Sequence, residues 1–142
     1  MTTLTRTVRT NTAPDVVLAY LADFRHAPEW DSGTVRCDRV SGDGGVGTVY
    51  RNVSRFAGRE VELDYIVESI DDKRFVIVGK NATTTSRDSI TVTPSGTGSE
   101  VHYLAEFTFT GPARFLGPLM TPLLNRLGDK TAETLHAALE RQ

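Results

Sequence analysis

Hydrophobic residues at helical spacing run through the C-terminal segment 113–142. They are Leu116, Met120, Leu123, Leu124, Leu127, Leu135 and Leu139. Apolar side chains three and four positions apart form one continuous stripe along an α-helix. With Thr121 as N-cap and Pro122 in the first turn, the pattern predicts a helix of about 20 residues, roughly 30 Å long. A helix of this length needs a concave surface against which to bury its stripe.

Between Val35 and Thr110 the chain follows the shorter period of strands. The clearest case is the segment 59–70, whose alternate positions are Val61, Leu63, Tyr65 and Val67 on one side and Glu60, Glu62, Asp64 and Glu68 on the other. Successive side chains of a strand point to opposite faces, so the first set should face the interior. The prediction is a curved antiparallel sheet wrapped around the terminal helix.

The same parity places polar and aromatic side chains on the inner face of other strands. In segment 47–56 the inward residues would be Tyr50, Asn52 and Phe56, because the alternate positions include two arginines. In segment 84–93, Ile90 and Val92 should be inward, which places Asp88 on the same face. Segment 101–109 would set Val101, Tyr103, Ala105, Phe107 and Phe109 beneath the helix. Segment 75–78 is continuously apolar, so its parity stays open.

The N-terminal region predicts one strand and two short helices. Residues 4–10 carry a modest apolar face, and Thr12 with Asp15 three residues later resembles a capping box. Pro14 would then lie in the first turn of a short amphipathic helix. A second brief helix or turn, residues 25–31, contains the single tryptophan, Trp30.

The stretch Thr12-Ala-Pro-Asp-Val-Val-Leu-Ala-Tyr-Leu-Ala-Asp-Phe-Arg-His-Ala-Pro-Glu-Trp-Asp31 resembles the opening of START-related polyketide cyclase/dehydrase-like proteins of the SRPBCC superfamily. In that superfamily a first strand leads to two short helices that end in a Pro-x-Trp element. The resemblance extends over the whole chain and implies one domain, residues 1–142. The implied fold is an α+β helix grip: about seven antiparallel strands in the order β-α-α-β6-α, curved around a long C-terminal helix, with an internal cavity for an apolar or amphipathic ligand. It does not imply one reaction, because the superfamily includes binders, lipid carriers and cyclases.

The inward residues are the candidate lining of this cavity. The expected ligand-binding residues are Trp30, Tyr50, Asn52, Phe56, Leu63, Tyr65, Ile90, Tyr103, Phe107, Leu116, Met120, Leu124 and Leu127. Candidates for chemistry are Tyr50, Tyr65, Tyr103 and Asp88, since phenols donate hydrogen bonds to carbonyls and a buried carboxyl can have a raised pKa. Alternatively, the phenols only fill the core, Asp88 pairs with Arg87, and Trp30 plugs the interior.

These residues favour the binding or carrying of a hydrophobic or amphipathic small molecule, such as a lipid, an isoprenoid or a polyketide-like compound. The expected pocket volume is roughly 300 to 1,000 Å³. One alternative is a polyketide cyclase, aromatase or dehydratase that uses the inward Tyr and Asp groups. Another is a protein-interaction module, which an exposed apolar patch would favour. Whether any reaction is catalysed stays open.

Composition and charge limit the classes of partner that the protein is expected to bind. Net charge is −2 with basic and acidic residues interspersed, which argues against nucleic acid. No run of 18 apolar residues and no N-terminal signal pattern occurs, so we expect no stable membrane insertion and a cytoplasmic location. The lone Cys37 excludes an intrachain disulfide, and the histidines are too scattered to predict a metal site. The oligomeric state, monomer or homodimer, stays open.

Two further features bear on cofactors and gating. The glycine-rich segment 42–47 matches G-x-G-x-x-G, but a predicted strand follows it where a dinucleotide site needs a helix, so we expect no cofactor. Pro118 and Pro122 should interrupt a helix that starts at Ala113, and a hinge there could gate the cavity. The loops 40–47 and 79–85 are alternative lids.

Overall fold

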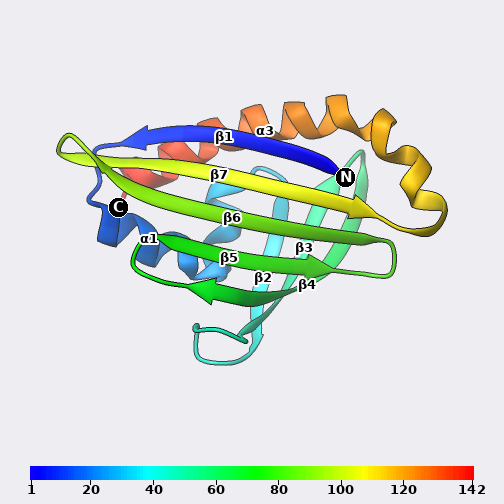
Figure 1. Cartoon of the computed structure of the whole chain (residues 1–142), viewed down its shortest axis with the longest axis horizontal. Helices are drawn as coiled ribbons and strands as arrows, with labels where there is room; N and C mark the ends of the chain where they lie inside the picture. Colours follow the sequence, from blue (N-terminus) through cyan, green and yellow to red (C-terminus); the bar gives the residue numbers. More distant parts are fainter.

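A single antiparallel sheet forms the frame of the molecule. The computed structural model describes residues 1–115 and 118–142 with their side chains. Its seven strands are β1 (Thr2–Thr10), β2 (Thr34–Ser41), β3 (Val49–Phe56), β4 (Arg59–Ile70), β5 (Arg74–Lys80), β6 (Thr84–Ser95) and β7 (Gly98–Phe109). They lie in the order β1-β7-β6-β5-β4-β3-β2, so six consecutive strands form a meander and β1 joins it beside β7 (Figure 1). The predicted helix-grip arrangement of strands and helices is confirmed.

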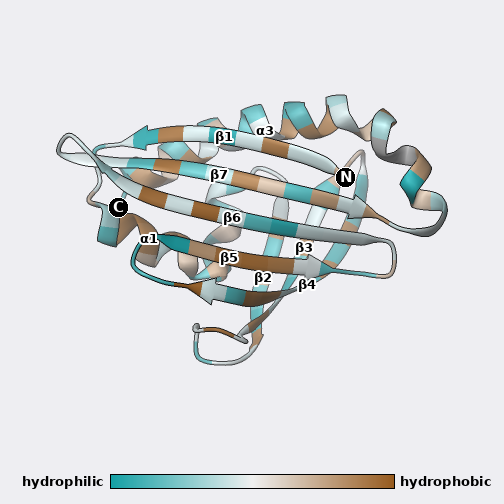
Figure 2. Ribbon diagram, viewed as in Figure 1, coloured by the Kyte–Doolittle hydropathy of each residue, from teal (hydrophilic) through white to brown (hydrophobic). Residues whose placement is uncertain are grey.

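Period-two alternation decides which side chains enter the interior. Along β4, Leu63, Tyr65 and Val67 are buried while their acidic neighbours are exposed, as predicted. Along β6, Ser86, Asp88, Ile90 and Val92 are all buried. Strand β5 is hydrophobic over most of its length (Figure 2), and it is buried at three consecutive positions, Phe75, Val76 and Ile77. Its continuous apolar run therefore reflects burial on both faces.

Three short elements connect β1 to β2: α1 (Pro14–Ala22), a 3₁₀ turn η1 (Phe24–His26) and α2 (Ala27–Trp30). Helix α1 starts at Pro14 as expected, but the capping prediction is wrong, because Ala13 is the N-cap and no side chain caps the helix. The Thr12 hydroxyl instead donates a hydrogen bond of 2.6 Å to the carbonyl of Leu139. Thr12 thus ties the start of α1 to the end of the C-terminal helix.

The C-terminal helix α3 (Gly117–Glu140) begins earlier than predicted and follows a second 3₁₀ segment, η2 (Gly111–Leu116). Pro122 lies inside α3 rather than at its start, and the helix continues through it. A proline this close to the N-terminus removes only one backbone hydrogen bond of the first turns. Burial of Leu124 and part of Met120 favours the continuous helix, although Leu123, which we expected in the same stripe, is 39% exposed.

An aromatic cluster fills the end of the sheet beneath α1 and α2. Its centre is Phe24, whose ring lies 4.9 Å from Tyr65, 6.0 Å from Tyr50 and 6.1 Å from Trp30, measured between centroids. These three partners come from two strands and a helix, so the cluster locks the short helices onto the sheet. Buried side chains of the hydrophobic core pack the interior at this end.

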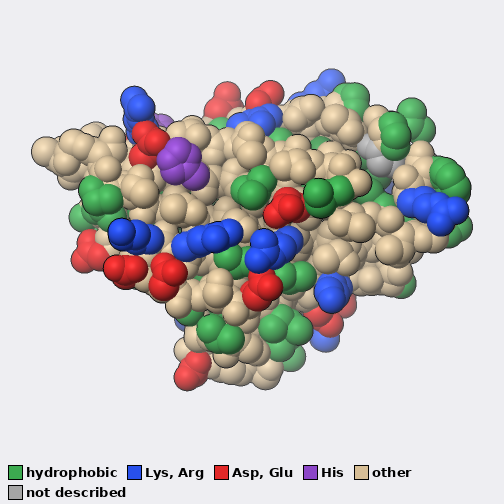
Figure 3. Space-filling model, in the orientation of Figure 1, with side chains coloured by type: hydrophobic (Ala, Val, Ile, Leu, Met, Phe, Trp, Pro, Cys, Tyr) green, Lys and Arg blue, Asp and Glu red, His purple; other side chains and the backbone are tan. Residues whose placement is uncertain are grey.

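Cross-strand ion pairs cover the outer face of the sheet. Arg51 contacts Asp64 at 3.2 Å, Arg87 contacts Glu68 at 2.9 Å, and Figure 3 shows basic and acidic side chains lying beside one another on the face in view. These residues sit at the outward positions that the alternation predicts. None of the helices in the described part of the chain is long and apolar enough to cross a membrane.

Candidate functional site: a cavity between the sheet and helix α3

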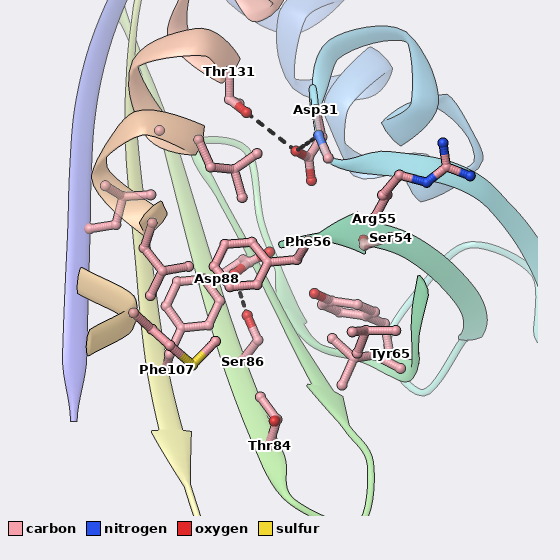
Figure 4. A pocket seen from close by; sticks show the side chains of 18 of the residues that line it. Asp31, Ser54, Arg55, Phe56, Tyr65, Thr84, Ser86, Asp88, Phe107 and Thr131 are labelled. Carbon is pink, nitrogen blue, oxygen red and sulfur yellow. Dashed lines mark hydrogen bonds between the residues drawn. The ribbon is translucent and has the colours of Figure 1, made fainter. Parts of the chain in front are cut away.

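At the other end of the sheet, a cavity of about 140 Å³ that is partly open to solvent lies between α3 and the strands. It lies between the inner faces of β3, β4, β6 and β7, the edge strand β1, the connection from α2 to β2, and one face of α3. The volume is below the expected range, and Figure 4 shows Phe56 and Phe107 occupying part of the space. The lining residues are Leu4, Asp31, Gly33, Ser54, Arg55, Phe56, Val61, Leu63, Tyr65, Thr84, Ser86, Asp88, Tyr103, Phe107, Phe109, Met120, Leu124, Leu127, Gly128 and Thr131.

One wall of the cavity is polar, because three successive inward positions of β6 carry Thr84, Ser86 and Asp88 (Figure 4). The Ser86 hydroxyl donates a hydrogen bond of 3.1 Å to Asp88 Oδ1. The hydroxyl end of Tyr65, from β4, points toward this row. On the side of α3 the wall is apolar and consists of Met120, Leu124 and Leu127.

A second carboxyl group, that of Asp31, reaches the cavity from the residue that follows α2. The Gly33 N–H and the Thr131 hydroxyl donate to Asp31 Oδ1 at 3.1 and 3.3 Å, and the Thr34 hydroxyl donates to Oδ2 at 3.0 Å. Because Thr131 belongs to α3, this carboxylate also joins the helix to the α2–β2 connection (Figure 4). Asp31 is therefore held in one orientation by two residues that follow it closely in sequence and by one residue of a distant helix.

Burial governs the protonation of these groups. Removal from water is the main cause that raises the pKa of Asp88 to about 7, and repulsion from Asp31 adds to it. The hydroxyls of Ser86 and Tyr103 oppose the rise because they favour the ionised carboxylate. Burial likewise raises the pKa of Asp31, against hydrogen bonds from Gly33 and two threonines. Near neutral pH, Asp88 can both hold and release a proton.

The cavity brings together most of the residues nominated from the sequence. Those that line it are Phe56, Leu63, Tyr65, Asp88, Tyr103, Phe107, Met120, Leu124 and Leu127. They come from the strands β3, β4, β6 and β7 and from α3, and each follows the inward parity or the helical stripe expected of it. Burial raises the pKa of the Tyr65 and Tyr103 phenols well above the ordinary value, so both hydroxyls keep their protons and can donate hydrogen bonds.

Four nominated residues are buried elsewhere. Trp30, Tyr50 and Ile90 belong to the core beneath α1 and α2, and none of them lines the cavity. Asn52 is also buried away from it and accepts a hydrogen bond of 2.6 Å from Ser54. Inward parity selects a face of the sheet but does not say which end of that face is filled. Leu116, the remaining nominee, lies outside the described residues.

The most important residues missing from the sequence prediction are Asp31, Ser86 and Thr131. Ser86 shares the parity of Asp88, so that alternation already carried its signal. Thr131 and Gly128 continue the helical spacing of Leu124 and Leu127, but neither has an apolar side chain, so the hydrophobic pattern does not include them. Nothing in the local pattern at Asp31 distinguishes it from an ordinary turn residue.

Metal and thiol chemistry find little support around the cavity. The described residues contain no group of three or more His, Cys, Asp or Glu side chains arranged to hold a metal ion. Cys37 is buried, and burial raises the pKa of its thiol to about 12. The chemistry that the arrangement offers is hydrogen bonding and proton exchange by carboxyl and hydroxyl groups.

A curved antiparallel sheet closed by a long C-terminal helix over a lined cavity defines the helix-grip class of proteins. Solved structures share this fold over almost the whole chain. A START superfamily protein from Mycobacterium smegmatis has a TM-score of 0.74 at 15% identity, with 98% of this chain and 94% of that chain covered. The Zhui aromatase/cyclase from Streptomyces sp. R1128 has a TM-score of 0.78 at 12% identity, covering 98% and 92%. The KanY protein is 26% identical, with a TM-score of 0.73 and 97% of each chain covered.

The family model described as "Polyketide cyclase / dehydrase and lipid transport" matches residues 1–140. The chain therefore belongs to this family, as the resemblance of its N-terminal stretch indicated. No curated protein matches its sequence.

Proposed function

We propose that the protein binds and carries a small apolar or amphipathic molecule, of the lipid, isoprenoid or polyketide-like kind, in the cavity beneath α3. The observation that supports this most is the division of the cavity into an apolar wall on α3 and a polar row on β6. Ligand pockets commonly combine mainly hydrophobic walls with a few placed polar groups. The family description, which includes lipid transport, agrees with this role.

The cavity volume limits what fits without rearrangement. A dry apolar cavity of about 150 Å³ is known to accept benzene. At about 140 Å³ this cavity suits a small aromatic ring system or the end of a chain. A longer ligand would need the segment of α3 that carries Met120 and Leu124 to move outward.

Acid–base catalysis is the second candidate, and the environment of Asp88 favours it. A carboxyl group whose pKa is raised to about 7 can take up and return a proton near neutral pH. The protonated phenols of Tyr65 and Tyr103 would polarise a substrate carbonyl in the same cavity. A cyclase or dehydratase acting on a poly-carbonyl chain would use these groups together.

One experiment tests the binding role and separates the two candidates. Thermal unfolding is measured with isoprenoid alcohols, sterols and aromatic polyketide-like phenols, and a ligand of the cavity should raise Tm in a concentration-dependent way. Mass spectrometry of the ligand after incubation then shows its fate. An unchanged ligand supports carriage, whereas loss of water supports the dehydratase candidate.

A matched pair of variants locates the binding. Val61→Phe adds bulk to the cavity from β4, whereas Ile66→Phe places the same side chain on the outer face of the same strand, where Ile66 is 50% exposed. We expect Val61→Phe to abolish the ligand-induced rise in Tm and Ile66→Phe to keep it. A rise that persists in Val61→Phe, or no rise with any ligand in the unmodified protein, would contradict the proposal.

A further inference from the structure

The charges that face the cavity are all of one sign. Two carboxyl groups, those of Asp31 and Asp88, line it from opposite elements, the α2–β2 connection and β6. Among the described residues, the lining contains no lysine and no histidine, and its single arginine is Arg55. The side chain of Arg55 is 64% exposed, pairs with Glu60 at 3.3 Å and points away from the cavity in Figure 4.

The two arginines of the neighbouring edge strand β1 are also paired with other residues, Arg9 with Glu100 at 2.9 Å. Arg6 of β1 contacts Asp129 at 2.8 Å and donates to the carbonyl of Asn125 at 3.0 Å, and it does not line the cavity. The described lining therefore offers carboxylate and hydroxyl oxygens but no positive charge for an anion.

We propose that Asp31 and Asp88 select the head group of the ligand: the site takes an apolar ring or chain that ends in a hydroxyl or amino group and rejects one that ends in a carboxylate. This inference rests on the proposed binding function and names its ligand class. A hydroxyl or amino group can donate a hydrogen bond to either carboxylate. A ligand carboxylate would be desolvated beside two acidic groups with no cation to offset it.

The geometry supports selection at this end of the cavity. Asp31 is fixed by three hydrogen bonds, so it cannot turn away from an incoming anion without losing them. Asp88 is 4% exposed and is held by Ser86, so water screens its charge only weakly. Both side chains present oxygen to the same cavity (Figure 4).

The test uses three probes of nearly equal size and shape: 2-naphthol, 2-naphthylmethylamine and 2-naphthoate. Their dissociation constants are measured at pH 8, above the raised pKa of about 7 of Asp88, by naphthalene fluorescence and by calorimetry. The proteins are the unmodified chain, Asp31→Asn, Asp88→Asn and the double variant. Asp72→Asn is the matched control, since it removes the same charge from an exposed turn. Thermal unfolding shows that each variant is folded.

We expect the unmodified protein to bind the naphthol and the amine at least about tenfold more tightly than the naphthoate, a difference of about 1.4 kcal/mol. In the double Asn variant this preference should fall to within about threefold, with intermediate values for the single variants. Asp72→Asn should keep the full preference. Because each single variant should already reduce the preference, the test still gives a result if one of the two variants fails to fold.

Two other outcomes have distinct meanings. If naphthoate binds the unmodified protein as tightly as naphthol, and Val61→Phe abolishes both, the charge selection is wrong while the binding function stands. If no probe binds, or if Val61→Phe leaves the binding unchanged, the binding function fails and the selection fails with it.

Discussion

At the scale of single residues, Asp88 combines a high energetic cost of burial with a clear potential use. A carboxyl group that is only 4% exposed loses most of its hydration on folding, and this loss is the main reason for its raised pKa. Ser86 and Tyr103 compensate only in part. Replacing such a group with a hydrophobe would be stabilising in many cores, so its presence beside a cavity points to a role in the site.

The raised pKa of Asp88 predicts the pH dependence of stability. The folded state binds this proton more tightly than the unfolded state does, so the contribution of Asp88 to stability is fully present below about pH 4 and is lost as the pH rises toward the folded value of about 7. At about 1.4 kcal/mol for each pKa unit, the upper limit of this loss is about 4 kcal/mol. Asp88→Asn should remove it, so the variant becomes more stable than the unmodified protein at pH 8.

Urea unfolding at intervals between pH 4 and pH 8 measures this dependence. Asp72→Asn is again the control and should follow the unmodified protein. Parallel stability profiles for Asp88→Asn and the unmodified protein would show that the carboxyl of Asp88 does not titrate between these limits.

At the scale of elements, the register of β4 against β5 positions a cavity residue. Tyr65 pairs with Gly79 across the two strands, and a Cβ atom at Gly79 would lie 2.6 to 2.7 Å from the Tyr65 ring. The glycine therefore leaves room for the ring to lie over the neighbouring backbone. From this position the Tyr65 hydroxyl points into the cavity (Figure 4).

We expect Gly79→Ala to displace the Tyr65 ring and to destabilise the protein by about 1 to 3 kcal/mol, the usual cost of overpacking. Ligand affinity should fall as well, because the phenol leaves its place in the cavity wall. Equilibrium denaturation and the naphthol titration measure the two effects. Gly45→Ala is the matched control: Gly45 has no positive φ, and an added Cβ would meet only Asp43, at 3.3 Å. If both variants have equal stability, the close approach to Tyr65 has no energetic weight.

At the scale of the whole molecule, α3 is anchored mainly by its C-terminal half. Thr134 donates to the carbonyl of Trp30 at 2.6 Å, Thr131 contacts the Ser32 hydroxyl at 2.9 Å, and the carbonyl of Leu139 accepts from Thr12 at 2.6 Å. The N-terminal half instead covers the cavity, and its outer side exposes apolar residues, including Leu119 at 73%. A ligand larger than the cavity would enter most easily by displacing this half.

Amide hydrogen exchange tests whether this half opens. Residues 119–127 should exchange faster than residues 129–139, because Pro122 removes one bond of the helix and the outer side of this segment is exposed. Pro122→Ala should narrow the difference by restoring that donor, and a bound ligand should narrow it further. Equal exchange in the two halves of the unmodified protein would exclude gating by α3 and would direct attention to the loops 40–47 and 79–85.

Several parts of the fold follow from local patterns. The alternation in β4 and β6 predicted which residues are inward, including Asp88, because side-chain direction in a strand has a period of two regardless of the partner strands. Helix α3 begins before Thr121, the predicted N-cap, because tertiary burial of residues such as Leu124 outweighs the low helix propensity of Pro122. Local signals define elements well and their ends less well.

The class of architecture, the inner face of each alternating strand and the apolar stripe of the last helix could be predicted from the order of residues. These features depend on short-range periodicity, which the order of residues contains directly. The packing of distant elements, by contrast, places Trp30 and Tyr50 in the core and Tyr65 and Tyr103 in the wall of a cavity. It also sets the size of that cavity and the approach of Asp31 to Asp88. Both depend on how distant elements pack against one another, and no local spacing encodes the distance between two faces.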